Sequence, residues 1–148
     1  MRVAIGSDHA GFRLKQDLAA QVAAGGHSVL DLGTNSEDPV DYPDFSAAVA
    51  RAVRDGRADR GIVVCGSGAG AAVAANKVRG IRAASAHDVY TAHQAVEHDD
   101  VNVLTLGSRV IGEELAAEIV GTFLGARFSG DERHVRRLAK VKALEDSF

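Results

Sequence analysis

Residues 61–70 read GIVVCGSGAG, a short apolar run followed by three glycines at alternate positions. A continuous apolar, β-branched run is typical of a strand that is buried on both faces of a parallel sheet. The glycines permit a tight turn that leads into a helix. This stretch therefore predicts a strand–loop–helix unit, the repeating element of an α/β protein.

The rest of the chain repeats this alternation of short apolar runs and helical periodicity. We expect five strands, at 2–6, 28–32, 61–65, 82–85 and 101–106. We expect helices at 12–24, 45–54, 70–77, 89–98, 112–124 and 131–147. With 148 residues and no repeat or linker, the chain is predicted to form a single domain, 1–148, with an α/β fold. Five parallel strands with helices on both faces make a Rossmann-like three-layer α-β-α sandwich.

Charge and composition exclude several classes of protein. Lys and Arg number 17 against 20 Asp and Glu, a net charge of -3, which argues against nucleic-acid binding. No apolar run approaches the roughly 20 residues that span a bilayer, so no membrane partner is expected. The single cysteine, Cys65, cannot form an intramolecular disulfide, which indicates a reducing compartment and hence a cytoplasmic protein.

The loop after the third expected strand is suited to holding an anion. Gly66, Gly68 and Gly70 allow successive backbone N–H groups to turn toward one ligand. The loop lacks the Gly-Lys-Ser/Thr ending of a Walker A site, and its glycine spacing differs from a dinucleotide fingerprint. The loop is therefore expected to bind a small anionic ligand. The Cys65 thiol would lie at the edge of this site and act as a nucleophile or base. The alternative is that Cys65 is simply a small buried hydrophobe.

Other polar residues stand where strands end or helices begin. Asp8 and His9 follow the first strand, although Asp8 could also act only as a helix cap. His98 precedes the fifth strand and could move protons near pH 7, or be a plain surface histidine. Because His93 and His98 are five apart and do not share a helix face, no metal site is predicted.

Basic residues near the C-terminal end of the chain could grip a phosphate. Arg133 and Arg137 are four apart and share one helix face, while Arg109 directly follows the fifth strand. The alternative is a solvated basic helix, and we accept that interpretation for Arg136.

Taken in order, these motifs resemble the ribose-5-phosphate isomerase B family, which includes the galactose-6-phosphate isomerase subunits LacA and LacB. The resemblance covers nearly the whole chain. It rests on GSDHAGF at 6–12, DYPDF at 41–45, GIVVCGSGAG at 61–70, AANKVRGIRA at 74–83, NVLTLGSR at 102–109, and Arg133-His134 with Arg137. One branch of that family has a glutamate at the position of Ala71, so Cys65 with Ala71 places this chain in the cysteine-base branch.

The resemblance implies an enzyme without metal or organic cofactor that interconverts an aldose phosphate and a ketose phosphate. It assigns the base that moves a proton between C1 and C2 to Cys65, and stabilisation of the enediolate to Ser67 with the backbone of Gly66, Gly68, Ala69 and Gly70. It assigns ring opening to His98, the sugar hydroxyls to Asp8 and Tyr42, and the phosphate to His9, Arg109, Arg133 and Arg137.

The resemblance also implies a homodimer whose active site lies at the subunit interface and whose C-terminal helix docks on the partner subunit. It leaves open whether dimers pair into tetramers.

The predicted reaction is the conversion of D-ribose 5-phosphate to D-ribulose 5-phosphate through a cis-enediolate, a step of the pentose phosphate pathway. Alternatives are an isomerase of D-allose 6-phosphate or D-galactose 6-phosphate, and a non-catalytic sugar-phosphate-binding protein. Relatives usually carry Asn after His98, whereas this chain has Asp99, an acceptor when it is ionised. Asp99 could therefore shift the substrate preference, or contact the substrate only through its backbone.

Overall fold

The computed structural model describes residues 1–148, and its core is a five-stranded sheet with all strands parallel. The strand order is β2-β1-β3-β5-β4. The strands are β1 (Arg2–Ser7), β2 (Ser28–Asp31), β3 (Arg60–Cys65), β4 (Ala83–Ser85) and β5 (Val103–Gly107). The prediction of five parallel strands is confirmed.

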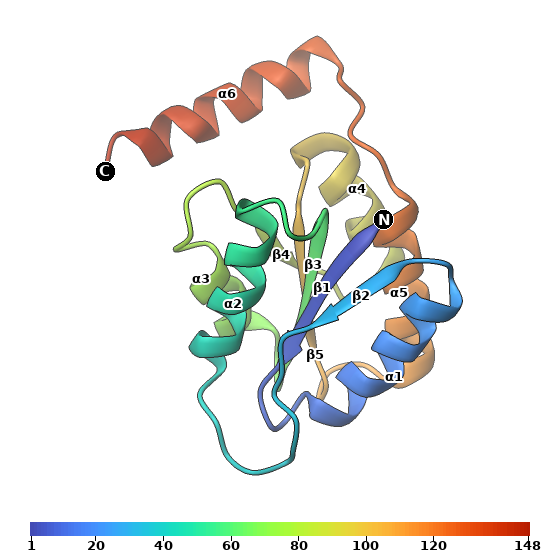
Figure 1. The fold of residues 1–148 in the computed structure, drawn as a ribbon. Helices are drawn as coiled ribbons and strands as arrows, with labels where there is room; N and C mark the ends of the chain where they lie inside the picture. The colour runs from blue at the N-terminus through green and yellow to red at the C-terminus, as the bar shows by residue number, and fades with distance from the viewer.

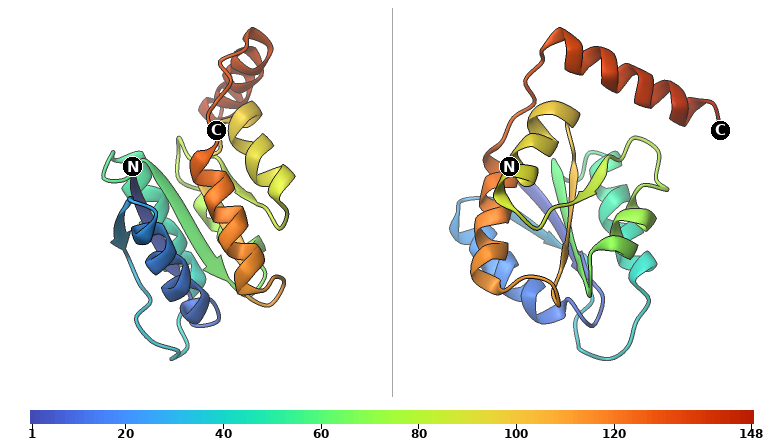
Figure 2. Two further views of the ribbon diagram at one scale, coloured as in Figure 1. Left: turned by 90° about the vertical axis from the view of Figure 1, so that its right-hand side faces the viewer. Right: turned by 180° about the vertical axis from the view of Figure 1, so that it is seen from behind.

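Helices cover both faces of the sheet, which confirms the predicted three layers (Figure 1). The helices are α1 (Phe12–Ala24), α2 (Tyr42–Arg54), α3 (Ala69–Ala75), α4 (Val89–Asp99), α5 (Glu113–Gly125) and α6 (Glu132–Asp146). One face is covered by α2 and α3, and the other by α1, α4 and α5, as the view from behind also shows (Figure 2). No helix is both long and apolar enough to cross a membrane.

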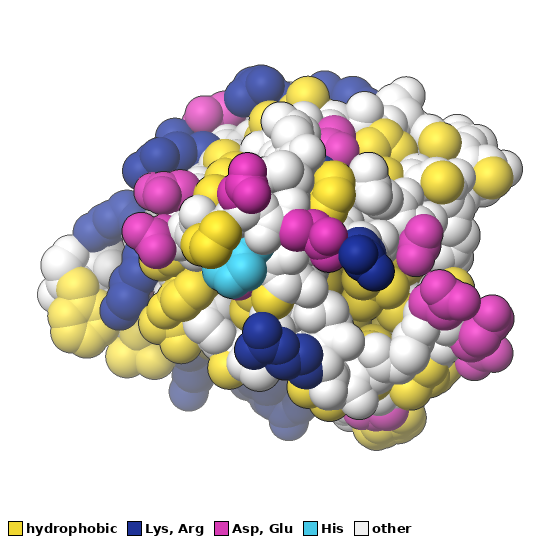
Figure 3. Space-filling view, turned by 90° about the horizontal axis from the view of Figure 1, so that it is seen from below, with side chains coloured by type: hydrophobic (Ala, Val, Ile, Leu, Met, Phe, Trp, Pro, Cys, Tyr) yellow, Lys and Arg dark blue, Asp and Glu magenta, His cyan; other side chains and the backbone are white.

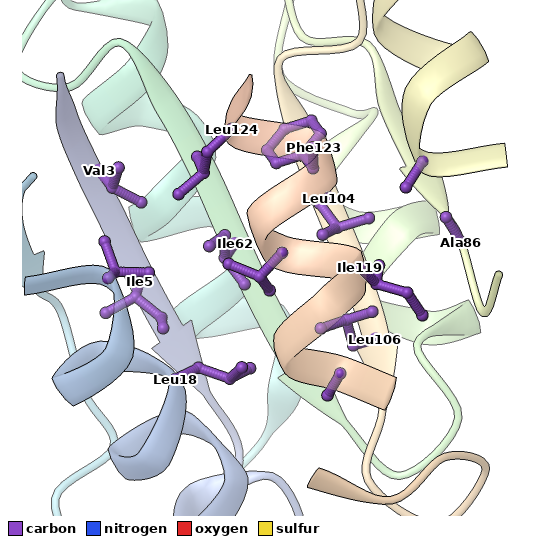
Figure 4. Packing of buried hydrophobic residues seen from close by; sticks show 14 of the residues in the cluster. Val3, Ile5, Leu18, Ile62, Ala86, Leu104, Leu106, Ile119, Phe123 and Leu124 are labelled. Atoms are coloured by element: carbon purple, nitrogen blue, oxygen red, sulfur yellow. The ribbon is translucent and has the colours of Figure 1, made fainter. Parts of the chain in front are cut away.

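Each central strand contributes side chains to both cores. In β3, Ile62 and Val64 belong to the larger cluster, beneath α1, α4 and α5, while Val63 and Cys65 belong to the smaller cluster, beneath α2 and α3. Figure 4 shows the larger cluster, with Phe123 of α5 over the sheet. This two-sided burial explains why the strands are continuous apolar runs rather than alternating ones.

The strand order changes direction between β1 and β3. From β1 the chain passes outward to β2, and from β3 the sheet continues to β5 and β4. In open parallel sheets this switch point leaves a crevice beyond the carboxyl ends of the two strands. Asp8 and Gly66, which directly follow β1 and β3, therefore lie at its mouth.

Several predicted boundaries differ from the structure by one to three residues, and two of these differences have an identifiable reason. Helix α2 begins at Tyr42 rather than at residue 45, because Pro43 fits the first helical turn, where its missing N–H is not needed. Strand β5 begins at Val103 rather than at residue 101, because the Val101 N–H bonds to the Ala95 carbonyl at the end of α4.

Helix α6 lies beyond the amino-terminal edge of the sheet and extends away from the layers (Figures 1 and 2). Its far end is attached to the segment before β4, where the Glu145 carboxylate accepts the Gly80 N–H at 3.1 Å. Val135, Val141 and Leu144 remain 50%, 50% and 63% exposed. Thus α6 leaves an apolar surface that its own chain does not cover.

The β1–α1 turn lies so close to β3 that it accepts no side chain at Gly11. A Cβ there would overlap the carbonyl of Val64. We expect Gly11→Ala to lower the free energy of unfolding by about 1–3 kcal/mol, because backbone must move. Urea unfolding measures this. In the control Gly121→Ala, a Cβ meets nothing within 4 Å inside α5, so stability should rise by about 0.5–1 kcal/mol. Equal stability of Gly11→Ala and the wild type would contradict the argument.

Candidate active site

A pocket opens at the switch point, at the carboxyl ends of β1, β3 and β5. Its lining residues are Asp8, Tyr42, Cys65, Gly66, Ser67, Gly70, Arg109 and Val110. All but Val110 were predicted from the sequence. Figure 3 looks onto this edge of the molecule and shows a histidine with basic and acidic side chains on the same face. Asp8 and Arg109 give the lining of the pocket one charged group of each sign.

The Cys65 thiol and the glycine loop form the centre of this pocket. Cys65 is 4% exposed, and its Sγ accepts the Gly68 N–H at 3.1 Å. Gly68 has φ +83°, a conformation that strains any residue with a Cβ. An N–H donor aimed at sulfur stabilises a thiolate more than a thiol, because hydrogen bonds to charged acceptors are stronger. The geometry thus suits a base more than a simple packing role.

The hydroxyl of Ser67 and the backbone that follows it face the same space. Ser67 is exposed, and its Oγ accepts the Ala69 N–H at 3.2 Å. Helix α3 begins at Ala69, and the backbone N–H groups of its first turn form a positive end. The loop can therefore present a hydroxyl and amide hydrogens to an oxyanion.

Asp8 and His9 enter from the β1–α1 turn. Asp8 is 8% exposed, and its Oδ1 accepts the Gly11 N–H at 3.0 Å, so the capping alternative accounts for one of its two oxygens. The other oxygen receives no hydrogen bond from the protein. The Nδ1 of His9 lies 3.1 Å from the Val40 nitrogen and 3.2 Å from the Val40 carbonyl oxygen. His9 is thus held by the 33–41 segment beside the pocket.

Tyr42 and Arg109 close the pocket from two other sides. A Cβ on Gly70 would lie 2.7 Å from the Tyr42 ring, so the tyrosine rests directly on the first turn of α3. A Cβ on Gly66 would lie 3.3 Å from Nη1 of Arg109. The backbone N–H of Arg109 donates to the Gly66 carbonyl at 3.0 Å. The glycines at 66 and 70 therefore allow these two side chains to approach the loop.

The remaining predicted residues lie at the opposite edge of the sheet of the same chain. His98 and Asp99 end α4, which runs back to the amino-terminal edge, and Arg133 and Arg137 are on α6. The five residues of β5 span roughly 17 Å between the two edges. One chain therefore holds two separate groups of predicted site residues, one at each edge.

His98 has a partner that the sequence analysis did not assign. Its ring stacks on that of His134, with centroids 4.1 Å apart and an interplanar angle of 27°. His134 is 2% exposed; its Nδ1 lies 2.6 Å from Ser129 Oγ, and its buried Nε2 has no partner. The only sequence signal for the stacking of His134 on His98 is that His134 lies between Arg133 and Arg137. The group at this edge thus consists of an imidazole pair with exposed arginines nearby.

Burial lowers the pKa of His134, and the neighbouring His98 and Arg133 lower it further. The ring therefore favours its neutral form, in which it can stack on His98 without charge repulsion. Arg133 lies 3.4 Å from Asp131, whereas Arg137 forms no ion pair within the chain. Across the whole structure, no group of three or more His, Cys, Asp or Glu side chains is placed to hold a metal ion.

Comparison with known proteins identifies the family. The model of the Ribose/Galactose Isomerase family matches residues 3–141. Ribose-5-phosphate isomerase B of Escherichia coli is 44% identical over 97% of this chain and 96% of its own. This chain belongs to the ribose/galactose isomerase family.

Solved structures of the family superpose on this chain over nearly its whole length. Ribose-5-phosphate isomerase B of Clostridium thermocellum has a TM-score of 0.97 at 48% identity, covering 99% of both chains. The enzyme of Mycoplasma genitalium with bound ribulose-5-phosphate has a TM-score of 0.94 at 40% identity, covering 99% of this chain and 97% of its own. Relatives at 43% and 39% identity are named D-erythrulose-4-phosphate isomerases, so the family acts on more than one sugar phosphate.

The lowered pKa of His134 makes stability depend on pH. Below about pH 6.5 the unfolded chain takes up a proton that the folded ring resists, so the free energy of unfolding falls as the pH drops. We expect His134→Gln, which cannot titrate, to lose less stability than the wild type between pH 7.5 and pH 5.5. Urea unfolding at several pH values measures the difference. Between pH 7.5 and 8.5 the difference in the free energy of unfolding between the two proteins should stay constant. A difference that also stays constant down to pH 5.5 would contradict the lowered pKa of His134.

Proposed function

We propose that this protein is an aldose–ketose isomerase that interconverts D-ribose 5-phosphate and D-ribulose 5-phosphate, the pentose-phosphate-pathway step, through a cis-enediolate. The observation that carries this proposal is the Cys65 thiol beside the Gly68 N–H in an anion-binding loop at the switch point of the sheet. The family match and the related structure with bound ribulose-5-phosphate support it. Because Cys65 must stay reduced to act, a cytoplasmic location fits the same proposal.

The chemistry requires a base beside the carbon that loses its proton. In the open-chain aldose, the Cys65 thiolate removes the proton from C2 while the carbonyl oxygen at C1 becomes an oxyanion. The proton of the C2 hydroxyl passes to the oxygen at C1, and the same sulfur returns the carbon-bound proton to C1, which produces the ketose with its carbonyl at C2. Ser67 and the loop N–H groups stabilise the enediolate oxygens, and one such donor is typically worth about 3 kcal/mol. Asp8 has one carboxylate oxygen without a hydrogen bond from the protein, and this oxygen accepts a hydrogen bond from a sugar hydroxyl.

We also propose that the complete site forms between two copies of the chain. His98, Arg133 and Arg137 are at the sheet edge opposite to Cys65, too far to act on one five-carbon sugar in the same chain. A two-fold axis would bring this edge of one copy against the Cys65 pocket of the other. The exposed apolar side chains of α6 give that helix a surface to dock on the partner subunit.

In this arrangement the basic residues hold the phosphate. Arg133 and Arg137 lie one turn apart on α6, and Arg137 has no competing carboxylate in its own chain. His9 and Arg109 approach from the Cys65 side. His98 opens the furanose ring by proton transfer, and the buried His134 fixes the plane of its ring. Holding the phosphate far from the reacting carbons orients the chain of the sugar, which lowers the entropic part of the barrier.

A six-carbon substrate, D-allose 6-phosphate or D-galactose 6-phosphate, is the second candidate. The family description names galactose as well as ribose, and Asp99 next to His98 is exposed and can accept a hydrogen bond from a further hydroxyl.

The substrate proposal is tested by measuring kcat/KM for ribose 5-phosphate, allose 6-phosphate, galactose 6-phosphate and erythrulose 4-phosphate. We expect the highest value for ribose 5-phosphate. Cys65→Ala should lose at least 100-fold in kcat, the usual contribution of a positioned base being about 10²–10⁴, while still binding sugar phosphate. Near-normal turnover by Cys65→Ala would refute the assignment of the base.

The interface proposal is tested by mixing two inactive variants, Cys65→Ala and His98→Asn. After random subunit exchange half of the dimers are mixed, and one of their two sites has both residues intact, so about a quarter of wild-type activity should return. As a control, Cys65→Ala mixed with Asp8→Asn should recover nothing, since both changes lie in the same half-site. Absence of recovery in proven mixed dimers would contradict the interface site.

A further inference from the structure

A chain of three hydrogen-bonding groups leads from the core to the glycine loop. Thr105 in β5 is fully buried, and its Oγ1 lies 2.6 Å from Oγ of Ser85 at the end of β4. These residues are register partners in the parallel pair of β4 and β5. Ser85 Oγ in turn lies 3.1 Å from the carbonyl oxygen of Gly68, to which it donates. Ser85 at the end of β4 and Thr105 in the middle of β5 thus support the glycine loop.

The direction of each bond follows from the number of hydrogens. The Gly68 carbonyl can only accept, so the one hydroxyl hydrogen of Ser85 points at it. Thr105 must therefore donate to Ser85. A valine of the same shape would fill the position of Thr105 in an otherwise apolar core, and a buried hydroxyl costs free energy unless it is used. The hydroxyl of Thr105 therefore has a role other than filling space.

Gly68 connects these hydrogen bonds of Thr105 and Ser85 to the thiol of Cys65. Its carbonyl accepts both Ser85 and the Ala72 N–H, the latter at 3.0 Å, while its own N–H donates to Cys65 Sγ. At φ +83° no side chain of Gly68 packs to hold it. The hydrogen bonds at its carbonyl, together with the close packing of its backbone against Leu106 in β5, therefore hold its orientation.

We propose that Ser85 and Thr105 are positioning residues that hold the Gly68 N–H on the sulfur of Cys65 and thereby set the reactivity of its thiolate. The proposal rests on the proposed role of Cys65 as the base. Other titratable groups facing the thiol are Asp8 from the β1–α1 turn, Tyr42 from α2 and Arg109 from the β5–α5 turn. None of them contacts Ser85 or Thr105 through a hydrogen bond, so changes at these two residues act through Gly68.

The test measures the rate at which iodoacetamide alkylates Cys65, without substrate, from pH 5.5 to 9.5. Because Cys65 is the sole cysteine, this rate reports on one thiol. In Thr105→Val and Ser85→Ala we expect the alkylation rate at neutral pH to fall about tenfold, because the thiolate loses part of its hydrogen-bond stabilisation. The kcat for ribose 5-phosphate should fall with it, while KM stays near the wild-type value.

Matched variants separate positioning from folding. Thr105→Ser restores the hydroxyl and should restore the wild-type profile, whereas Thr105→Val should be at least as stable as Thr105→Ser in urea. Ser28→Ala removes an exposed serine that begins β2, at the far edge of the sheet, and should leave the profile unchanged.

Coincident alkylation profiles for folded Thr105→Val, folded Ser85→Ala and the wild type would overturn the proposal. A changed alkylation profile in the two variants, together with a wild-type protein that isomerises none of the sugar phosphates, would support the positioning role of Ser85 and Thr105 and refute the proposed function instead.

Discussion

The approach of three backbone segments at the carboxyl end of β3 is the constraint on which the rest of the structure depends. The Asp8 N–H bonds to the Val64 carbonyl at 3.2 Å, and the Ser108 N–H bonds to the Cys65 carbonyl at 2.8 Å. A Cβ on Gly107 would lie 2.6 Å from the backbone of Ser67. Because side chains are missing where the segments meet, amide groups rather than methyl groups surround the thiol, and an anion can be bound there.

The sheet itself separates the functional groups. Parallel strands place every loop that follows a strand at one edge and every helix end that precedes a strand at the other. Asp8 and Cys65 consequently share an edge, whereas His98 and the arginines of α6 share the opposite edge. One chain thus holds these two groups of residues at opposite edges, and in the proposed dimer the exposed apolar face of α6 lies against the partner subunit.

The sequence predicts the fold well where its signals are local. The prediction for α1, 12–24, agrees with the structure at both ends, because its apolar spacing is regular and the glycine pair at 25–26 ends it. The predicted start of β5 is wrong because the Val101 N–H bonds to Ala95 in α4, and Asn102 bonds to Arg82, a residue distant in sequence. The partners His134 and Ser85 have no local signal at all, since a stack or a hydrogen bond between strands leaves no periodic pattern.

The layered α/β architecture, the glycine loop and the chemical groups can be read from the sequence, because burial periodicity and backbone freedom are properties of short segments. Which of these groups meet depends on the folding of the whole chain. It joined Asp8, Tyr42, Cys65 and Arg109 in one pocket, and it placed His98, stacked on His134, at the other edge. The reason is that strand order and helix direction, which set these distances, arise from packing of the whole chain and are not encoded in any one segment.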